Sequence, residues 1–322
     1  MKKIILCLLA LILLVTPLIA SCDADKQDDG RLSIVCTIFP EYDWIVQILA
    51  DHADEVNLTM LLDNGVDLHS YQPSAADILT ISTCDVFVYI GGESDSWVKD
   101  ALEGVTNKDM LVVDIMTVLS DALKEEEIIE GMEGEEEEEE EESPEYDEHV
   151  WLSLKNAAVV CEKLGQTLGK ADPDNAADYA ANAAAYIALI DALGTRYEEA
   201  ICAAGKDTLV FCDRFPFRYL VEDYSLNYYA AFIGCSAETE ASFETIAFLA
   251  NKIDELSLKY VLTIDNSNVN IASTIIASTK SKDAEILVLD SLQSITAQDI
   301  EDGTSYLEIM EENLEVIKKA LS

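Results

Sequence analysis

The chain has 322 residues, 50% of them hydrophobic, and a formal net charge of −43 at pH 7. Its length and apolar content are enough for one large or two medium-sized buried cores. The negative charge argues against nucleic acid and anionic membrane surfaces as partners, because both would repel it, and it suits the binding of cations.

Residues 1–22 are typical of an export signal. Lys2 and Lys3 give a positive start, and a short apolar stretch interrupted by Pro17 follows them. The small residues before Cys22 resemble a bacterial lipobox, so we expect cleavage there and a lipid on Cys22. An uncleaved anchor or an ordinary cleavage site is the alternative. With residues 23–31 as a polar tether, the pattern predicts an extracytoplasmic protein anchored to the bacterial cell membrane.

Residues 32–171 predict an N-terminal α/β lobe. Strand-like runs at 32–38, 55–62, 85–90 and 111–115 alternate with helical spacing at 41–51, 74–82 and 94–103, and a further helix follows Trp151. Strands that alternate with helices favour a parallel sheet covered on both faces. The acidic segment 121–147 interrupts this pattern. It holds too little apolar surface to order itself, so we interpret it as a mobile loop inserted in the lobe.

Residues 172–204 predict one long helix that joins the two halves. Asp172 can cap it and Pro173 suits its first turn. A continuous helix here would span about 50 Å, which suggests a rigid strut. Residues 205–322 then repeat the strand–helix alternation. The expected fold is therefore α/β, with two lobes that each hold a mostly parallel sheet flanked by helices.

Polar side chains at the ends of predicted strands are the candidate site residues, because ligands bind at the carboxyl ends of strands in such sheets. His69 follows the strand 55–62, His149 ends the acidic segment, Cys212 and Asp213 end one C-terminal strand, and Asp290 ends another. Imidazole, thiolate and carboxylate groups bind zinc and similar metals. Each residue alone also has a structural explanation as a cap or a core side chain. Their joint placement favours a metal site between the lobes.

Four stretches resemble motifs of the metal-binding solute-binding lipoproteins of ABC transporters (cluster A-I), and the resemblance covers essentially the whole mature chain. They are "DLHSYQPSAADI", "DEHVWLSLKNA", "LVLDSLQS" and the terminal "SYLEIMEENLEVIKKAL". The resemblance implies two lobes joined by one long helix, with zinc or manganese held in the cleft. It also implies His69, His149 and Asp290 as ligands, and delivery of the ion to a membrane permease that a separate ATPase drives.

One further motif of the family lies between the second and third stretches quoted above, and there this chain departs from the family pattern. Many members have Phe-His-Asp, whereas this chain reads "FCDRF", with Cys212 in place of the histidine. A thiolate is a competent zinc ligand, so Cys212 can complete the set. Alternatively the position is silent, and Asp213 or water completes the coordination. Arg214 beside a cation would be costly unless it pairs with Asp213 or Asp290.

The expected cargo is Zn²⁺, with Mn²⁺ as the alternative. Two imidazoles with a thiolate form a soft ligand set that suits zinc, whereas coordination by Asp213 would favour manganese. A run of glutamates before His149 is either a cation-gathering loop or a solvated segment that aids solubility. The run consists of Glu135, Glu136, Glu137, Glu138, Glu139, Glu140, Glu141 and Glu142.

A binding protein, not an enzyme, is the expected function class, and we expect a monomer whose partners are the ion and the ABC permease. The sequence holds neither the GxxxxGK[ST] loop of an ATPase nor the HExxH motif of many zinc hydrolases. Two rival classes remain. One is an extracytoplasmic metallohydrolase with an open zinc position. The other is a surface adhesin or calcium buffer, although the regular calcium-loop motif is absent.

Overall fold

The computed structural model describes residues 30–133, 145–236 and 240–322. The predicted signal segment with Cys22, nearly all of the tether and the run Glu135–Glu142 lie outside these residues. Residues 32–322 form one compact unit, and both sheets belong to it. No helix in the described ranges combines the length and the hydrophobicity that a bilayer span requires.

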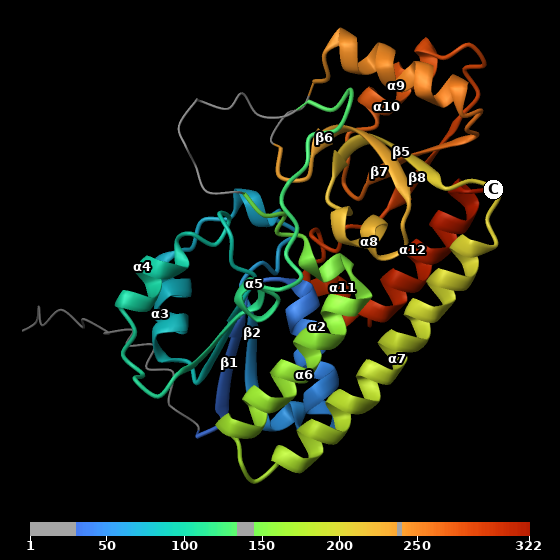
Figure 1. Cartoon of the computed structure of the whole chain (residues 1–322). Helices are drawn as coiled ribbons and strands as arrows, with labels where there is room; N and C mark the ends of the chain where they lie inside the picture. The colour runs from blue at the N-terminus through green and yellow to red at the C-terminus, as the bar shows by residue number, and fades with distance from the viewer. Residues whose placement is uncertain (1–29, 134–144, 237–239) are drawn as a thin grey trace, which may run out of the picture. The chain divides into compact units, whose positions relative to one another are not determined.

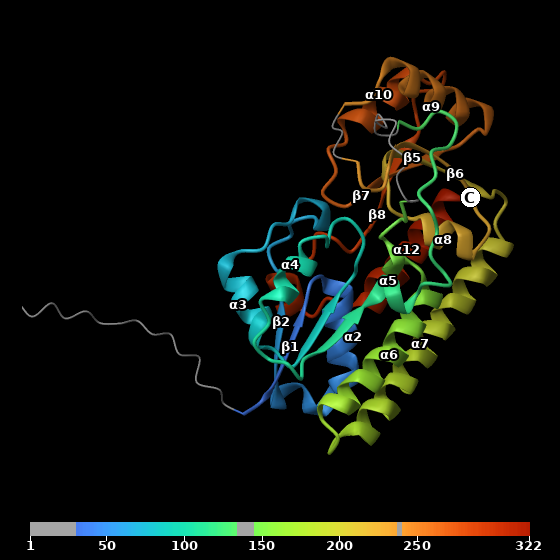
Figure 2. The same cartoon turned by 60° about the vertical axis from the view of Figure 1, so that its left-hand side comes forward.

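The N-terminal lobe is built on a four-stranded sheet. Its strands are β1 (Leu32–Cys36), β2 (Val56–Met60), β3 (Val86–Tyr89) and β4 (Leu111–Asp114). All neighbours are parallel, in the order β2-β1-β3-β4. Helices flank the sheet on both sides (Figures 1 and 2), which agrees with the mostly apolar residues of its strands. The helical elements of this lobe are α2 (Phe39–Leu49), η2 (Ala50–Glu55), η3 (Leu68–Ser70), α3 (Ala75–Thr83), α4 (Val98–Glu103), α5 (Ile115–Val118) and η4 (Val150–Leu152).

The C-terminal lobe repeats this plan. Its strands are β5 (Thr208–Phe215), β6 (Asn227–Ile233), β7 (Tyr260–Ile264) and β8 (Glu285–Leu289), and they are parallel in the order β6-β5-β7-β8. The register of β5 with β6 shifts between Phe211 and Arg214. The helices of this lobe are α8 (Arg218–Asp223), α9 (Phe243–Glu255), α10 (Asn270–Ser278), α11 (Ala297–Glu301) and α12 (Tyr306–Ala320). The predicted α/β class with two parallel sheets is therefore confirmed.

One long helix joins the lobes, as predicted. It is α7 (Ala176–Cys202), and its 27 residues span about 40 Å. It packs against α6 (Leu154–Ala171), α2 and α12, so it contacts helices of both lobes (Figure 1). The helix starts four residues later than Asp172, because Asp172 lies in the turn after α6. There its carboxylate accepts hydrogen bonds from Asn175 (2.8 Å) and Tyr179 (2.8 Å).

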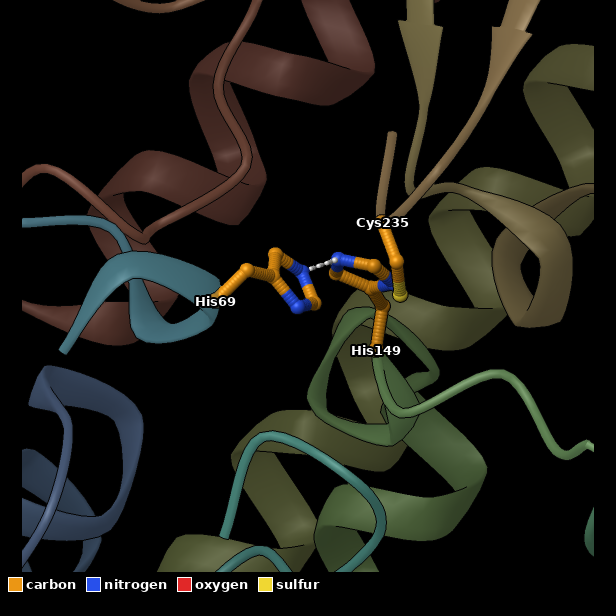
Figure 3. A group of neighbouring side chains, drawn as sticks. All are labelled: His69, His149 and Cys235. Carbon is orange, nitrogen blue, oxygen red and sulfur yellow. Dashed lines mark hydrogen bonds between the residues drawn. The ribbon is translucent and has the colours of Figure 1, made fainter. Parts of the chain in front are cut away.

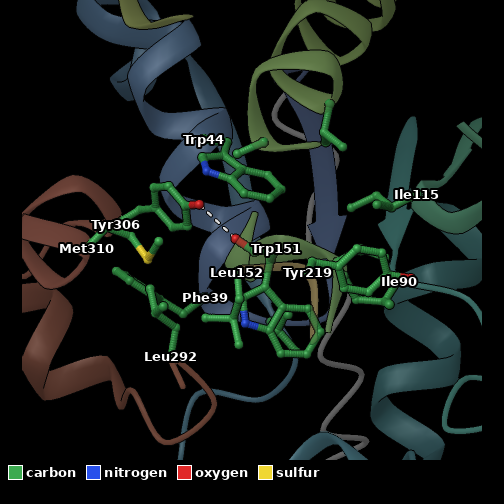
Figure 4. Close-up of a cluster of buried hydrophobic side chains, with 14 of the residues drawn as sticks. Phe39, Trp44, Ile90, Ile115, Trp151, Leu152, Tyr219, Leu292, Tyr306 and Met310 are labelled. Carbon is green, nitrogen blue, oxygen red and sulfur yellow. Dashed lines mark hydrogen bonds between the residues drawn. The ribbon is translucent and has the colours of Figure 1, made fainter. Parts of the chain in front are cut away.

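The two lobes share a buried aromatic junction (Figure 4). The indole of Trp151, in η4, donates to the carbonyl of Ser291 in the C-terminal lobe (2.9 Å). The hydroxyl of Tyr306, at the start of α12, donates to the carbonyl of Trp151 (2.7 Å). The ring of Tyr306 also meets Trp44 of α2 edge to face, at 5.3 Å between centroids. Buried polar bonds of this kind fix a packing register as well as adding stability.

We expect the Tyr306→Phe variant to lower the free energy of unfolding by about 1–3 kcal/mol, because it leaves the buried carbonyl of Trp151 without its donor and changes little else. Urea denaturation of both proteins measures the difference. Tyr260→Phe is the matched control, since Tyr260 is half-buried and its hydroxyl makes no hydrogen bond within the described residues. Equal destabilisation by the two variants would contradict a specific role for the Tyr306 hydroxyl.

Candidate metal centre

His69 is held at the start of the short helix η3. The side chain of Asp67 caps this helix by accepting from the backbone N–H of His69 at 3.0 Å. The imidazole Nδ1 lies 2.7 Å from the hydroxyl of Ser94. A carboxylate oxygen of Glu148 lies 3.7 Å from the same nitrogen. With Nδ1 engaged on this side, Nε2 is the nitrogen left to meet a ligand.

His149 is fully buried at the N-terminus of η4. One carboxylate oxygen of Asp147 accepts from its backbone N–H (2.8 Å) and lies 3.0 Å from its Nδ1. The ring packs against Trp151, which anchors η4 in the aromatic junction. A carboxylate on Nδ1 fixes the tautomer with the Nδ1 proton and leaves the lone pair on Nε2. Gly234 allows the opposite backbone to come close, since a Cβ there would lie 2.9 Å from the ring carbon Cε1 of His149.

The two imidazoles converge on one point. Their Nε2 atoms are 3.1 Å apart although the residues are 80 positions apart in the chain (Figure 3). A tetrahedral zinc ion with Zn–N distances of about 2.0–2.1 Å holds two nitrogen ligands about 3.3 Å apart. The observed spacing therefore needs little adjustment to place both nitrogens on one ion.

The pKa values of the two histidines shift in opposite directions. Burial, with His149 close by, lowers the pKa of His69 to about 3. Burial also opposes the charged form of His149, but the carboxylate of Asp147 outweighs it and raises the pKa of His149. His69 is thus neutral at physiological pH, as a metal ligand must be.

A cysteine completes the only group of potential metal donors found among the described residues. Cys235 lies in the turn after β6, and its sulfur and one ring nitrogen of each histidine all lie within 4.8 Å of one another. No site role is predicted for this residue from the sequence. The criterion that selected Cys212, a polar residue directly after a strand, also fits Cys235 in "NYYAAFIGC".

The structure does not bring Cys212 to the histidines. Along β5, Leu209 and Phe211 face the main core, whereas Val210 and Cys212 face a second apolar cluster formed with α9 and α10. This is the side-chain alternation of a strand, and it points Cys212 into the lobe's own interior. Its side chain is 1% exposed, and burial raises the pKa of the thiol.

The neighbouring charged residues also differ from expectation. The guanidinium of Arg214 pairs with Asp67 of the other lobe (2.8 Å), not with Asp213 or Asp290. Asp213 instead accepts from the backbone N–H groups of Arg214 (2.8 Å) and Ile264 (3.2 Å). The partner of Arg214 is not expected from the sequence because it lies in the other lobe, whereas a sequence motif indicates only partners that are near in the sequence.

Asp290 lies outside the group of donors around the two histidines. Its carboxylate accepts from the backbone N–H of Leu292 at 2.7 Å, and its own N–H donates to Asn313. Burial and the nearby charge of Asp265 raise the pKa of Asp290 to about 7. In these contacts the Asp290 carboxyl group ends β8, and it is not part of the donor group around the two histidines.

An acidic cleft leads to this group. It has a volume of about 780 Å³, and both lobes line it, with His69 on one side and Cys235 on the other. Six carboxyl groups also line it: Glu93, Asp100, Glu125, Glu126, Glu145 and Glu148. Arg214 also lines the cleft, but the carboxyl groups outnumber it. A concave surface of net negative charge raises the local concentration of cations, so the cleft favours divalent cations near the imidazoles.

The chain is similar to known zinc-binding and zinc-uptake proteins. The zinc-binding lipoprotein AdcA of Streptococcus pneumoniae is 33% identical over 325 residues, which cover 99% of this chain and 61% of AdcA. The chain thus spans about three fifths of that relative's length. The high-affinity zinc uptake system protein ZnuA of Bacillus subtilis is 28% identical, over 92% of this chain and 90% of that protein.

Solved structures show the same fold. The Zn(II)-bound ZnuA-like domain of Streptococcus pneumoniae AdcA matches with a TM-score of 0.70 and 28% identity, over 91% of this chain and 99% of the domain. The metal-dependent lipoprotein YcdH of Bacillus subtilis matches with a TM-score of 0.73 and 25% identity, over 90% and 99% of the two chains.

The sequence model of one family, described as zinc-uptake complex component A, periplasmic (ZnuA), matches residues 34–320. The match extends from β1 to the end of α12 and includes both lobes. The predicted resemblance to metal-binding solute-binding proteins of ABC transporters is confirmed, and this family serves uptake, not catalysis. The chain belongs to the ZnuA family of zinc-uptake complex components.

Proposed function

We propose that this protein captures Zn²⁺ between its two lobes, outside the cytoplasm, and delivers it to an ABC permease for high-affinity uptake. The observation that carries the proposal is the convergence of the Nε2 atoms of His69 and His149, 3.1 Å apart in a mostly buried site. The names of its relatives support zinc as the cargo.

The surroundings of the histidines suit the capture of a dication. Asp147 orients His149 and increases the basicity of its Nε2, as carboxylates do behind zinc-bound histidines. Ser94 plays the corresponding part for His69. When an ion enters, the hydrogen bond between the two rings is replaced by two bonds to the metal, and the proton between the two Nε2 atoms leaves. Imidazole ligands favour zinc, and manganese, which prefers oxygen ligands, is the alternative cargo.

Export, anchoring and delivery are parts of the same proposal. AdcA, which this chain resembles, is named a lipoprotein, and this supports a lipid on Cys22 that tethers the protein to the cell membrane. We propose that the loaded protein docks on its permease as a monomer and that no catalysis takes place at the metal. We also propose that the run Glu135–Glu142 gathers cations; Glu145, which follows it closely in the sequence, lines the acidic cleft.

Removing either converging imidazole tests the site. We expect His69→Ala and His149→Ala each to weaken Zn²⁺ binding by more than 100-fold, because loss of a ligand exceeds the effect of losing one of its hydrogen-bond partners. Isothermal titration with Zn²⁺ measures the affinity. His52→Ala is the matched control, since His52 lies in η2 and contacts Glu55 (2.9 Å) and Asp178 (3.3 Å). Full affinity in either site variant would overturn the proposal.

Asp147→Asn tests the support behind His149. An amide keeps the size of the side chain but removes the charge that fixes the Nδ1 proton, so we expect Zn²⁺ affinity to fall about 10–100-fold. A competition titration against a zinc chelator of known affinity measures this loss. Asp191→Asn, an exposed carboxylate on α7, should leave the affinity unchanged. An Asp147→Asn protein that binds as tightly as wild type would show that Asp147 only shapes the loop.

A further inference from the structure

We propose that Cys235 is the third protein ligand of the captured ion and that its thiolate selects zinc over manganese. This inference rests on the proposed function, because it concerns the same ion. The observation behind it is the position of the Cys235 sulfur beside both imidazoles, with all three donor atoms within 4.8 Å of one another (Figure 3).

The geometry requires only a small closing movement. A tetrahedral zinc ion with a Zn–S bond of about 2.3 Å and a Zn–N bond of about 2.0–2.1 Å separates sulfur from nitrogen by about 3.6 Å. From the observed limit of 4.8 Å, a shift of about 1 Å brings sulfur and nitrogen to this separation. The turn that carries Cys235 already lies against the ring of His149, because Gly234 has no side chain to keep it away.

The thiol also has a route for its proton. Glu126, a neighbour of the Cys235 thiol, lines the acidic cleft. When the ion binds, the S–H bond breaks, a metal–sulfur bond forms, and the proton passes to the Glu126 carboxylate and from there to solvent. No oxidant or other reactant is needed.

This ligand would give the site contributions from both lobes. His69 and His149 belong to the N-terminal lobe, whereas Cys235 follows β6 of the C-terminal lobe. Thiolate is a soft donor that favours zinc and is a poor ligand for manganese. Cys212 is then a core residue, in agreement with its place in the apolar cluster next to α9 and α10.

Cobalt substitution distinguishes the two cysteines. Co²⁺ bound by a thiolate gives an intense sulfur-to-metal charge-transfer band in the near ultraviolet, and Co²⁺ bound by nitrogen and oxygen alone does not. We expect the band in the wild-type protein and in Cys212→Ser. We expect Cys235→Ser and Cys235→Ala to lose it while they still bind one Co²⁺ per chain, and to bind Zn²⁺ at least 10-fold more weakly than wild type.

A wild-type Co²⁺ complex without the band would overturn the proposal and leave the proposed function standing, as would a band that persists in Cys235→Ser. Loss of the band in Cys212→Ser alone would assign the thiolate to Cys212 and equally overturn it. Wild-type protein that takes up neither Co²⁺ nor Zn²⁺ would overturn both. The far-ultraviolet circular dichroism of each metal-free variant should match that of wild type.

Discussion

The Nε2 atoms of two buried imidazoles face each other at 3.1 Å, and the surrounding structure serves to hold them there. With the Nδ1 proton of His149 held by Asp147, its Nε2 offers a lone pair to the space between the rings. Two lone pairs cannot share that space unless a proton or a cation lies between them. The nearby groups hold the rings in place: Asp67 caps the helix that carries His69, and Trp151 packs against His149. A dication that bonds both nitrogens can take the place of the proton between them.

The way in which the lobes are joined keeps the two imidazoles in place and leaves them accessible to an ion from one side. On one side of them, the bonds from Trp151 to Ser291 and from Tyr306 to Trp151 tie the lobes together in a buried aromatic junction. On the other side, the ion pair between Arg214 and Asp67 spans the lobes at the acidic cleft, and Arg218 and Glu127 form another ion pair between the lobes. A partly exposed ion pair of this kind contributes little to stability and separates more readily than packed aromatic rings. The cleft side is therefore the side on which an ion would enter and leave.

The two-lobe α/β fold could be predicted from the strand patterns, because parallel strands that are buried on both faces are largely apolar and alternate with helices. Placing polar residues at strand ends then selected His69 and His149, which do converge. The same reasoning could not decide whether the side chain of Cys212 points toward the histidines or into the C-terminal lobe. The four consecutive β5 residues from Leu209 to Cys212 are all buried, so hydrophobicity alone does not show which face the thiol occupies. The pairing of Arg214 with Asp67 joins residues 147 positions apart, and no local pattern reports such a contact.

In the proposed function, imidazoles from distant parts of the chain bind one zinc ion. X-ray absorption at the zinc K-edge on the full chain loaded with one equivalent of Zn²⁺ measures this directly. The account predicts a first shell that contains nitrogen at about 2.0–2.1 Å, with the outer-shell scattering of two imidazole rings. A spectrum with oxygen ligands alone and no imidazole scattering would contradict it.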